Sequence, residues 1–259
     1  MNRTSLHYGW KPDLPDNRDI KYAYAAPEAV LTNLPPKVDM RSKCPPVYDQ
    51  GQLGSCTGNA IAGAYQFELM KQNTSDFMPS RLFIYYNERV IENTVSTDSG
   101  AQIRDGMNSV SKQGVCTENM WPYVINEFAQ KPYEICYQDA LKHIVTSFHR
   151  INRDINQMKS CLADGYPFII GFTVYQSFEG LQVAQTGIVE LPKASEKVVG
   201  GHAVVVVGYD DSQEQFILRN SWSDDWGMKG YFTMPYAYLL DEHLSDDFWT
   251  IRLVSNSQL

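Results

Sequence analysis

The sequence predicts an α+β protein with a helical first half, a β-rich second half and a cleft between them. Three observations support this prediction. Small and apolar residues recur at helical spacing after residue 55, β-branched apolar runs follow residue 165, and no repeat or low-complexity segment interrupts either half. Apolar residues make up 43% of the 259 residues, which is enough for a packed core.

The first 36 residues differ from the rest of the chain. Five prolines break any long helix there and favour extended backbone: Pro12, Pro15, Pro27, Pro35 and Pro36. We therefore expect residues 1–36 to form a tail laid over a domain that spans residues 37–259.

Three helices are expected in the first half of that domain. Residues 56–70 carry small residues along one face, which is typical of a buried central helix. A second helix is expected over residues 80–89, with Ser80 as its N-cap. A third is expected over residues 102–112, where Gly114 marks its end.

Strands are expected in the second half. Residues 167–175 form an apolar, β-branched run that is bounded by polar and turn residues. Similar runs occupy residues 202–209, 215–218 and 248–253, and the polar segment 210–212 supplies a turn between two of them.

Composition argues against several classes of function. The formal net charge is −8 and no block of Lys or Arg stands out, so a nucleic-acid partner is not expected. No run of about 18 apolar residues is present, so no membrane partner is expected either. The N-terminus lacks the apolar run of a signal peptide, which leaves open a cytosolic protein, a mature form or export by another route.

Nothing in the sequence points to a metal. The five cysteines include no CxxC pair, the five histidines are scattered, and HExxH is absent. An odd number of cysteines leaves at least one thiol unpaired in any disulfide scheme within a monomer.

Cys56 is the candidate nucleophile. It stands where the first helix is expected to begin, and the positive end of a helix dipole favours a thiolate. Gly51 and Gly54 allow a tight turn just before it. Taken alone, a cysteine in such a position is more often a small buried residue.

Three segments together resemble the papain-like cysteine peptidases. Gln50-Gly-Gln-Leu-Gly-Ser-Cys56 is similar to the nucleophile segment of that family, and Gly-His202-Ala-Val is similar to its histidine segment. Asn220-Ser-Trp222, followed by Trp226-Gly and a later Gly-Tyr, is similar to its asparagine segment. The resemblance covers roughly residues 37–255.

The sequence departs from the family pattern at two positions. Thr57 stands directly after the nucleophile, where the family usually has an aromatic residue. Leu53 stands where many relatives have a cysteine of a structural disulfide, so that bridge cannot form.

The resemblance implies a papain-like two-lobed fold and a mechanism. The helical lobe would span about residues 50–150 and the β-rich, barrel-like lobe about residues 151–259. Thiolate Cys56, paired with imidazolium His202, would attack a peptide carbonyl and form a thioester that water then hydrolyses. Asn220 would orient His202, and Gln50 with the Cys56 N–H would stabilise the oxyanion. No cofactor is implied.

The resemblance also indicates the substrate-binding residues. Ser99 and Gly100, followed by Ala101, would hold the substrate backbone, and Ala203 would form part of the wall of a pocket with an apolar preference. Trp226 would line the leaving-group side, and Trp222 would shield the histidine–asparagine hydrogen bond from water. The implied partners are polypeptide substrates and proteinaceous inhibitors of cysteine proteases.

Several alternatives stay open at this point. Endopeptidase action is the first expectation, but an acyltransferase, an isopeptidase or a non-catalytic binding scaffold would show the same motifs. The chain has no room for the long helical prosegment that is common in the family. The Pro-rich stretch from Trp10 to Tyr22 is instead a candidate for a segment that lies across the cleft and restrains the enzyme. The alternative is a tail packed elsewhere for stability.

Overall fold

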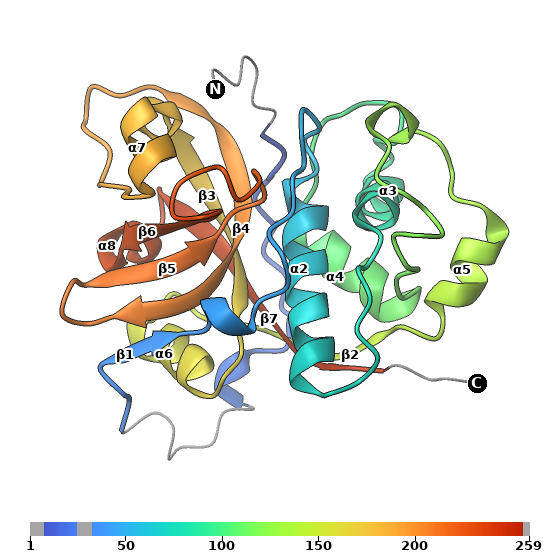
Figure 1. Ribbon diagram of the computed structural model, residues 1–259, viewed down its shortest axis with the longest axis horizontal. Helices are drawn as coiled ribbons and strands as arrows, with labels where there is room; N and C mark the ends of the chain where they lie inside the picture. Colours follow the sequence, from blue (N-terminus) through green and yellow to red (C-terminus); the bar gives the residue numbers. More distant parts are fainter. Residues whose placement is uncertain (1–7, 25–32, 256–259) are drawn as a thin grey trace.

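The computed structural model describes residues 8–24 and 33–255. Two lobes lie side by side, one built on helices and the other on an antiparallel sheet, and the helix α2 runs along the boundary between them (Figure 1). This is the α+β architecture that the sequence predicts.

The helical lobe is organised around one buried helix. This helix, α2 (Cys56–Lys71), is buried from its first residue to Leu69, and α3 (Arg81–Ile91), α4 (Ile103–Lys112) and α5 (Glu134–Ala140) complete the lobe. The expected cap of α3 is present, because Ser80 Oγ accepts a hydrogen bond from the Phe83 N–H at 3.1 Å. The predicted helices therefore begin and end within two residues of the observed ones.

The second lobe is built on an antiparallel sheet. Its strand order is β2-β7-β3-β4-β5-β6, and β1 pairs with β4 at one end. The strands are β1 (Lys37–Asp39), β2 (Val145–Arg150), β3 (Phe168–Tyr175), β4 (Val198–Asp210), β5 (Gln215–Arg219), β6 (Tyr231–Pro235) and β7 (Ser245–Val254).

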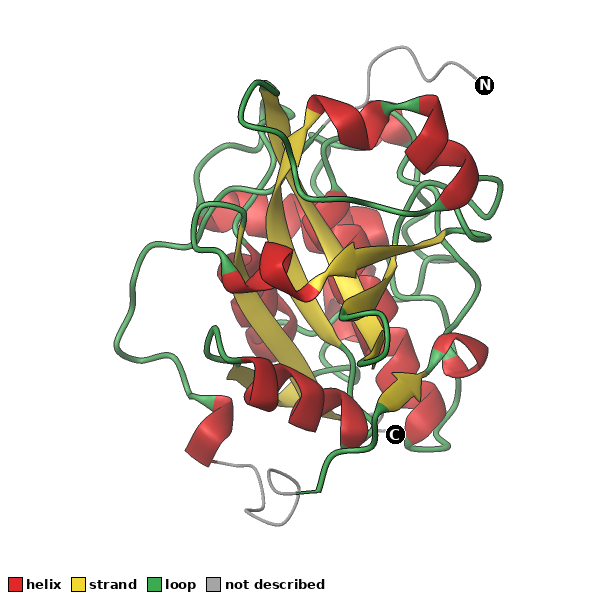
Figure 2. Ribbon diagram, turned by 90° about the vertical axis from the view of Figure 1, so that its left-hand side faces the viewer, coloured by secondary structure: helices red, strands yellow, loops and turns green. Residues whose placement is uncertain are grey.

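Short helices surround this sheet (Figure 2). They are α6 (Ile155–Ala163), α7 (Leu181–Thr186) and α8 (Tyr236–Leu240), with the 3₁₀ turns η1 (Tyr22–Tyr24), η2 (Arg41–Lys43), η3 (Ile125–Glu127) and η4 (Gln176–Glu179) elsewhere in the chain. Among the described residues, no helix is both long and apolar enough to cross a membrane.

Strand β4 is longer than the sequence predicts. The apolar run begins at His202, but the strand begins at Val198, because its first residues pair with β3 as far as Tyr175. The extra residues include Gly200 and Gly201, and the Gly201 carbonyl accepts a hydrogen bond from the Trp10 N–H. This extension carries the backbone beside the candidate active site.

Candidate active site

Cys56 is the first residue of α2 and is completely buried. The preceding turn uses Gly51 at a φ of 59°, a conformation that favours glycine. The Gly54 N–H then donates to both carboxylate oxygens of Asp98, at 3.1 and 3.0 Å. This turn aims the start of α2 at the sheet lobe, where the Ala203 backbone N–H reaches the Cys56 sulfur.

His202 lies on β4, next to Ala203, and its ring is hydrogen-bonded to Asn220 at 2.8 Å between Nε2 and Oδ1. Asn220 Oδ1 also accepts the Ser221 backbone N–H at 2.8 Å, which identifies that atom as the acceptor. Nε2 of His202 therefore carries a proton. The other ring nitrogen, Nδ1, has no hydrogen-bond partner among the described residues and is available to accept a proton.

Aromatic rings enclose this histidine. Trp222 stacks on the His202 ring at 4.9 Å between centroids and an interplanar angle of 27°. Trp226 meets Trp222 edge-on at 5.2 Å, and Phe172 and Phe178 pack around His202 from the sheet side. The rings exclude water from the His202–Asn220 hydrogen bond and so strengthen it.

Gln50 is held between the loop before Cys56 and the residue after Asn220. Its Oε1 accepts from Ser221 Oγ at 2.6 Å, and its Nε2 donates to the Leu53 carbonyl at 3.0 Å. The Gln50 backbone N–H donates to the Ser221 carbonyl at 2.9 Å. These contacts tie the two lobes together at the site.

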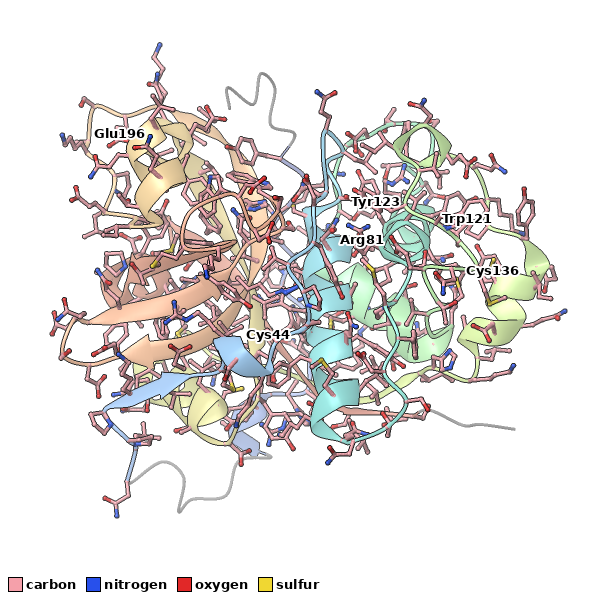
Figure 3. All side chains as sticks on the ribbon, in the orientation of Figure 1. Cys44, Arg81, Trp121, Tyr123, Cys136 and Glu196 are labelled. Carbon is pink, nitrogen blue, oxygen red and sulfur yellow. The ribbon has the colours of Figure 1, made fainter. Side chains whose placement is uncertain are left out.

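Two labelled residues of the helical lobe support this loop (Figure 3). The Tyr123 hydroxyl donates to the Gln50 carbonyl at 2.9 Å, and Arg81 Nη1 donates to the Asp49 carbonyl at 2.9 Å. The Arg81 guanidinium also lies 4.0 Å from the centre of the Tyr123 ring. Sequence reasoning did not identify either residue as part of the site.

The N-terminal tail passes through the site between the two lobes. The Gly9 carbonyl accepts the Ala101 N–H at 2.7 Å, and the Ala101 carbonyl accepts the Lys11 N–H at 3.1 Å. On the other side, the Trp10 N–H donates to the Gly201 carbonyl at 2.9 Å. The tail thus bridges the helical lobe and β4 over the start of α2.

Tail residues cover both members of the Cys56–His202 pair. The Gly9 backbone N–H points at the Cys56 sulfur, and the Tyr8 ring lies 6.0 Å from the His202 ring. The Tyr8 hydroxyl donates to Glu179 at 2.8 Å, which holds the ring in place.

The resulting burial changes both proton affinities. Burial raises the pKa of the Cys56 thiol to about 12, although the N–H groups of Ala203 and Gly9 oppose this shift. Burial also lowers the pKa of His202 to about 4, against the opposing effect of the Asn220 hydrogen bond. Beneath the tail, the Cys56 thiol and the His202 imidazole are therefore both neutral.

The four expected substrate-binding residues line different parts of the site. Ser99 Oγ lies 3.2 Å from Lys11 Nζ, and Gly100 is so close to the tail that a Cβ there would lie 2.0 Å from the Gly9 carbonyl oxygen. Ala203 is buried on β4 beside His202, and Trp226 lies in the aromatic group behind it. The first two belong to the helical lobe and the last two to the sheet lobe.

Other chemistry is not evident in the described part of the chain. No group of three or more His, Cys, Asp or Glu side chains there is arranged to hold a metal ion. None of the five cysteines is in a disulfide. Besides Arg81 and Tyr123, the sequence analysis did not identify Gly9 as a site residue, since Gly9 stands in no motif.

A family model, described as papain family cysteine protease, matches residues 34–239. The chain belongs to this family. It is a cysteine-type peptidase with the papain-like fold.

Individual relatives agree with this assignment. An uncharacterized peptidase C1-like protein of Acanthamoeba polyphaga mimivirus is 42% identical over 97% of this chain and 88% of its own length. The crystal structure of xylellain, a cysteine protease from Xylella fastidiosa, superposes with a TM-score of 0.90 and 45% identity, over 97% of this chain and 98% of xylellain. Procathepsin B from Trypanosoma congolense shares the fold, with a TM-score of 0.75 and 17% identity over 99% of this chain and 88% of that chain.

Proposed function

We propose that this papain-family protease is an endopeptidase that uses Cys56 as nucleophile and His202 as general base. The observation that carries the proposal is the His202–Asn220 hydrogen bond of 2.8 Å, which leaves Nδ1 of His202 available, while the N–H of the next residue, Ala203, reaches the Cys56 sulfur. An extended chain can run through the site, since the tail passes Cys56 with Tyr8 on one side and Trp10 on the other. Passage on both sides of the nucleophile favours cleavage within a chain.

In this mechanism, His202 takes the thiol proton and the Cys56 thiolate attacks the substrate carbonyl carbon. The resulting oxyanion is stabilised by the Cys56 backbone N–H and the Gln50 side-chain amide. The tetrahedral intermediate collapses, the C–N bond breaks, and His202 gives its proton to the leaving amine. Water, deprotonated by His202, then attacks the thioester and regenerates the thiol.

We further propose that the tail restrains the enzyme. Gly9 and Trp10 occupy the space beside Cys56 that a substrate would need, and the tail shares backbone hydrogen bonds with Ala101 and Gly201. Because the covered thiol and imidazole are both neutral, the reactive ion pair forms only after the tail has moved away.

The test is cleavage of a quenched peptide library under reducing conditions by the Gly9→Val variant, with and without Cys56→Ala. A Cβ at residue 9 would lie 1.7 Å from the Gly54 carbonyl oxygen, so Gly9→Val displaces the tail; we call this variant the open form. We expect the open form to cleave internal peptide bonds and Cys56→Ala to abolish cleavage. Cys44→Ala is the matched control, because Cys44 directly follows η2, where its thiol donates to the Met40 carbonyl (Figure 3).

Two outcomes would contradict the proposal. Full activity in the open form carrying Cys56→Ala would exclude Cys56 as the nucleophile. If a thiol reagent alkylates Cys56 of the open form, but the open form transfers acyl groups only to added amines, the protein is an acyltransferase and not an endopeptidase.

A further inference from the structure

The Trp10 side chain fills a pocket that two glycines on adjacent strands leave open. A Cβ added to Gly171 on β3 would lie 1.9 Å from Cε2 of the Trp10 indole. A Cβ added to Gly201 on β4 would lie 2.8 Å from Cε3 of the same ring. The backbones of both strands therefore form a flat surface that accepts a wide, planar side chain.

A buried carboxylate lies at the far edge of this indole. The Trp10 Nε1–H donates to Asp247 Oδ2 at 3.0 Å, and the Asp13 backbone N–H donates to the same oxygen at 2.8 Å. The other oxygen, Oδ1, accepts from Arg150 Nη2 at 2.8 Å. The Asp247 side chain is 0% exposed, so its charge depends on these contacts.

All three of these groups donate to Asp247, and an ionised carboxylate accepts all three with no proton of its own in the way. Burial and the neighbouring Asp13 carboxyl raise the pKa of Asp247, while the Asp13 N–H and Arg150 oppose that shift. Since each of the two oxygens faces an N–H group, the geometry favours the charged form.

Both donors to Asp247 Oδ2 belong to the tail. When the tail leaves, Oδ2 loses the Trp10 and Asp13 hydrogen bonds, while Oδ1 keeps Arg150. A buried acceptor without a donor costs free energy. A substrate side chain that donates to Oδ2 should therefore bind in this pocket more tightly than one that does not. The same asymmetry makes sites that bind a polar group discriminate strongly against analogues that lack it.

We propose that Asp247 is a specificity-determining residue that selects substrates with a planar side chain carrying a neutral N–H donor, above all tryptophan. This inference rests on the proposed function. Gly9 is the tail residue at the thiol, and Trp10 pairs with Ala101 in parallel. A substrate that runs in the opposite direction to the tail places in the Trp10 pocket the side chain two positions before the scissile bond.

The surrounding charges favour a neutral donor over a cation. In the tail-bound state Arg150 Nη1 lies 3.3 Å from Asp13 and 3.2 Å from Asp19, and Arg104 Nη2 lies 2.8 Å from Asp19. Both aspartates leave with the tail, whereas both arginines stay. The pocket then becomes more positive, which disfavours arginine or lysine in the substrate.

The experiment compares kcat/KM of the open form for four peptides that differ only at the second residue before the scissile bond. That residue is tryptophan, 3-benzothienylalanine, phenylalanine or arginine. Benzothienylalanine keeps the shape of the indole but replaces its N–H with sulfur. We expect the tryptophan peptide to be cleaved about tenfold faster than the benzothienylalanine peptide, because only the indole can pair with Asp247.

Two variants of the open form provide the controls. Asp247→Asn keeps the shape of the side chain. Its carboxamide oxygen should face Arg150, so that its NH₂ group faces the pocket and cannot accept from the indole. The tryptophan and benzothienylalanine peptides should then be cleaved at about the same rate. Asn also tolerates the backbone φ of 59° at this position. Asp246→Asn is the matched control, since Asp246 contacts Arg150 and Arg153 and is 45% exposed; it should keep the faster cleavage of the tryptophan peptide.

The outcomes separate this inference from the proposed function. Equal rates for tryptophan and benzothienylalanine, a faster arginine peptide, or equal loss of all four rates in Asp247→Asn would overturn the inference alone. No cleavage of any peptide by an open form whose Cys56 is alkylated normally would overturn the proposed endopeptidase, and this inference with it.

Discussion

The Gly9 Cα packs so closely against Gly54 that a Cβ on Gly9 would lie 1.7 Å from the Gly54 carbonyl oxygen. Gly54 is two residues before Cys56, so this contact seats the tail directly over the start of α2. The nearest obstacle is backbone, which cannot rotate away as a flexible side chain would.

Gly9→Val should therefore raise the rate at which a small thiol reagent alkylates Cys56. Steric overpacking costs about 1–3 kcal/mol, which corresponds to an increase of roughly fivefold to a hundredfold in the displaced state. The measurement is the alkylation rate near neutral pH. Leu14→Ala is the control, since the Leu14 side chain is 72% exposed, and equal rates in the two variants would contradict the prediction.

Asp13→Asn should also loosen the tail. The Asp13 carboxylate accepts from Trp249 Nε1 at 2.9 Å and from the Arg104 backbone N–H at 3.1 Å, and an amide NH₂ would face one of these donors. A buried mismatch of this kind costs about 1–3 kcal/mol, so Cys56 alkylation should accelerate at least fivefold. Asp16→Asn should change nothing, because Asp16 pairs with Arg18 inside the tail. If both variants accelerate Cys56 alkylation equally, the hydrogen bonds of Asp13 are not what holds the tail in place.

The reactivity of Cys56 should depend differently on pH in the two forms. Beneath the tail, the raised pKa of Cys56, about 12, and the lowered pKa of His202, about 4, keep both groups neutral between these values. The rate of Cys56 alkylation in the wild-type protein should thus be slow near neutral pH and rise steadily toward alkaline pH. In the open form it should reach a plateau near neutral pH, as expected of a thiolate–imidazolium pair. The alkylation rate of the corresponding Cys56→Ala variant is subtracted to remove the reaction of the other cysteines. If the pH profiles of the wild type and the open form coincide, the prediction is wrong.

Asn220→Ala should lower kcat/KM of the open form by about tenfold to a hundredfold. The His202 ring would lose its 2.8 Å hydrogen bond, worth about 1–3 kcal/mol in a buried site, and with it a defined orientation. The assay is peptide hydrolysis alongside thermal melting. An unchanged kcat/KM would show that Trp222 stacking alone orients the ring.

Glu88 provides a prediction about stability. It is completely buried under the start of α2, where its Oε2 accepts from Thr57 Oγ1 at 2.7 Å. Burial raises its pKa well above the usual carboxyl value, so the folded state binds a proton that the unfolded state releases. The stability that protonated Glu88 contributes is fully present below its pKa in the unfolded state, and it is lost as the pH rises toward its pKa in the folded state.

Glu88→Gln removes this titration. The stability of the variant relative to wild type should therefore increase between about pH 5 and 8. Urea denaturation at several pH values measures this difference, with Glu92→Gln as the control. A constant difference across the range would show that Glu88 is ionised in the folded protein.

Local patterns predicted much of this molecule. The helix at Cys56, the Ser80 cap and the strand β3 all depend on neighbours within a few residues, and each appears close to its predicted bounds. Strands β2 and β6 were not predicted, because they contain mixed polar and apolar residues and form only by pairing with distant partners.

The tail contacts could not be derived in the same way. The Pro-rich composition suggested an extended segment near the cleft, but the contact between Trp10 and Asp247 joins residues 237 positions apart. Gly171 and Gly201 read as ordinary strand glycines until the indole that occupies their missing side-chain volume is seen. Such a pocket depends on the assembled sheet, and no local periodicity encodes it.

The tail and the domain that it covers are one polypeptide, so docking is a unimolecular event. Its equilibrium does not change on dilution, and a free peptide substrate competes against an effective local concentration that is typically millimolar for a short tether. A single cut between the docked segment and β1 would turn docking into a bimolecular reaction. At cellular dilution the severed tail would then diffuse away, and the removal of the restraint would be irreversible.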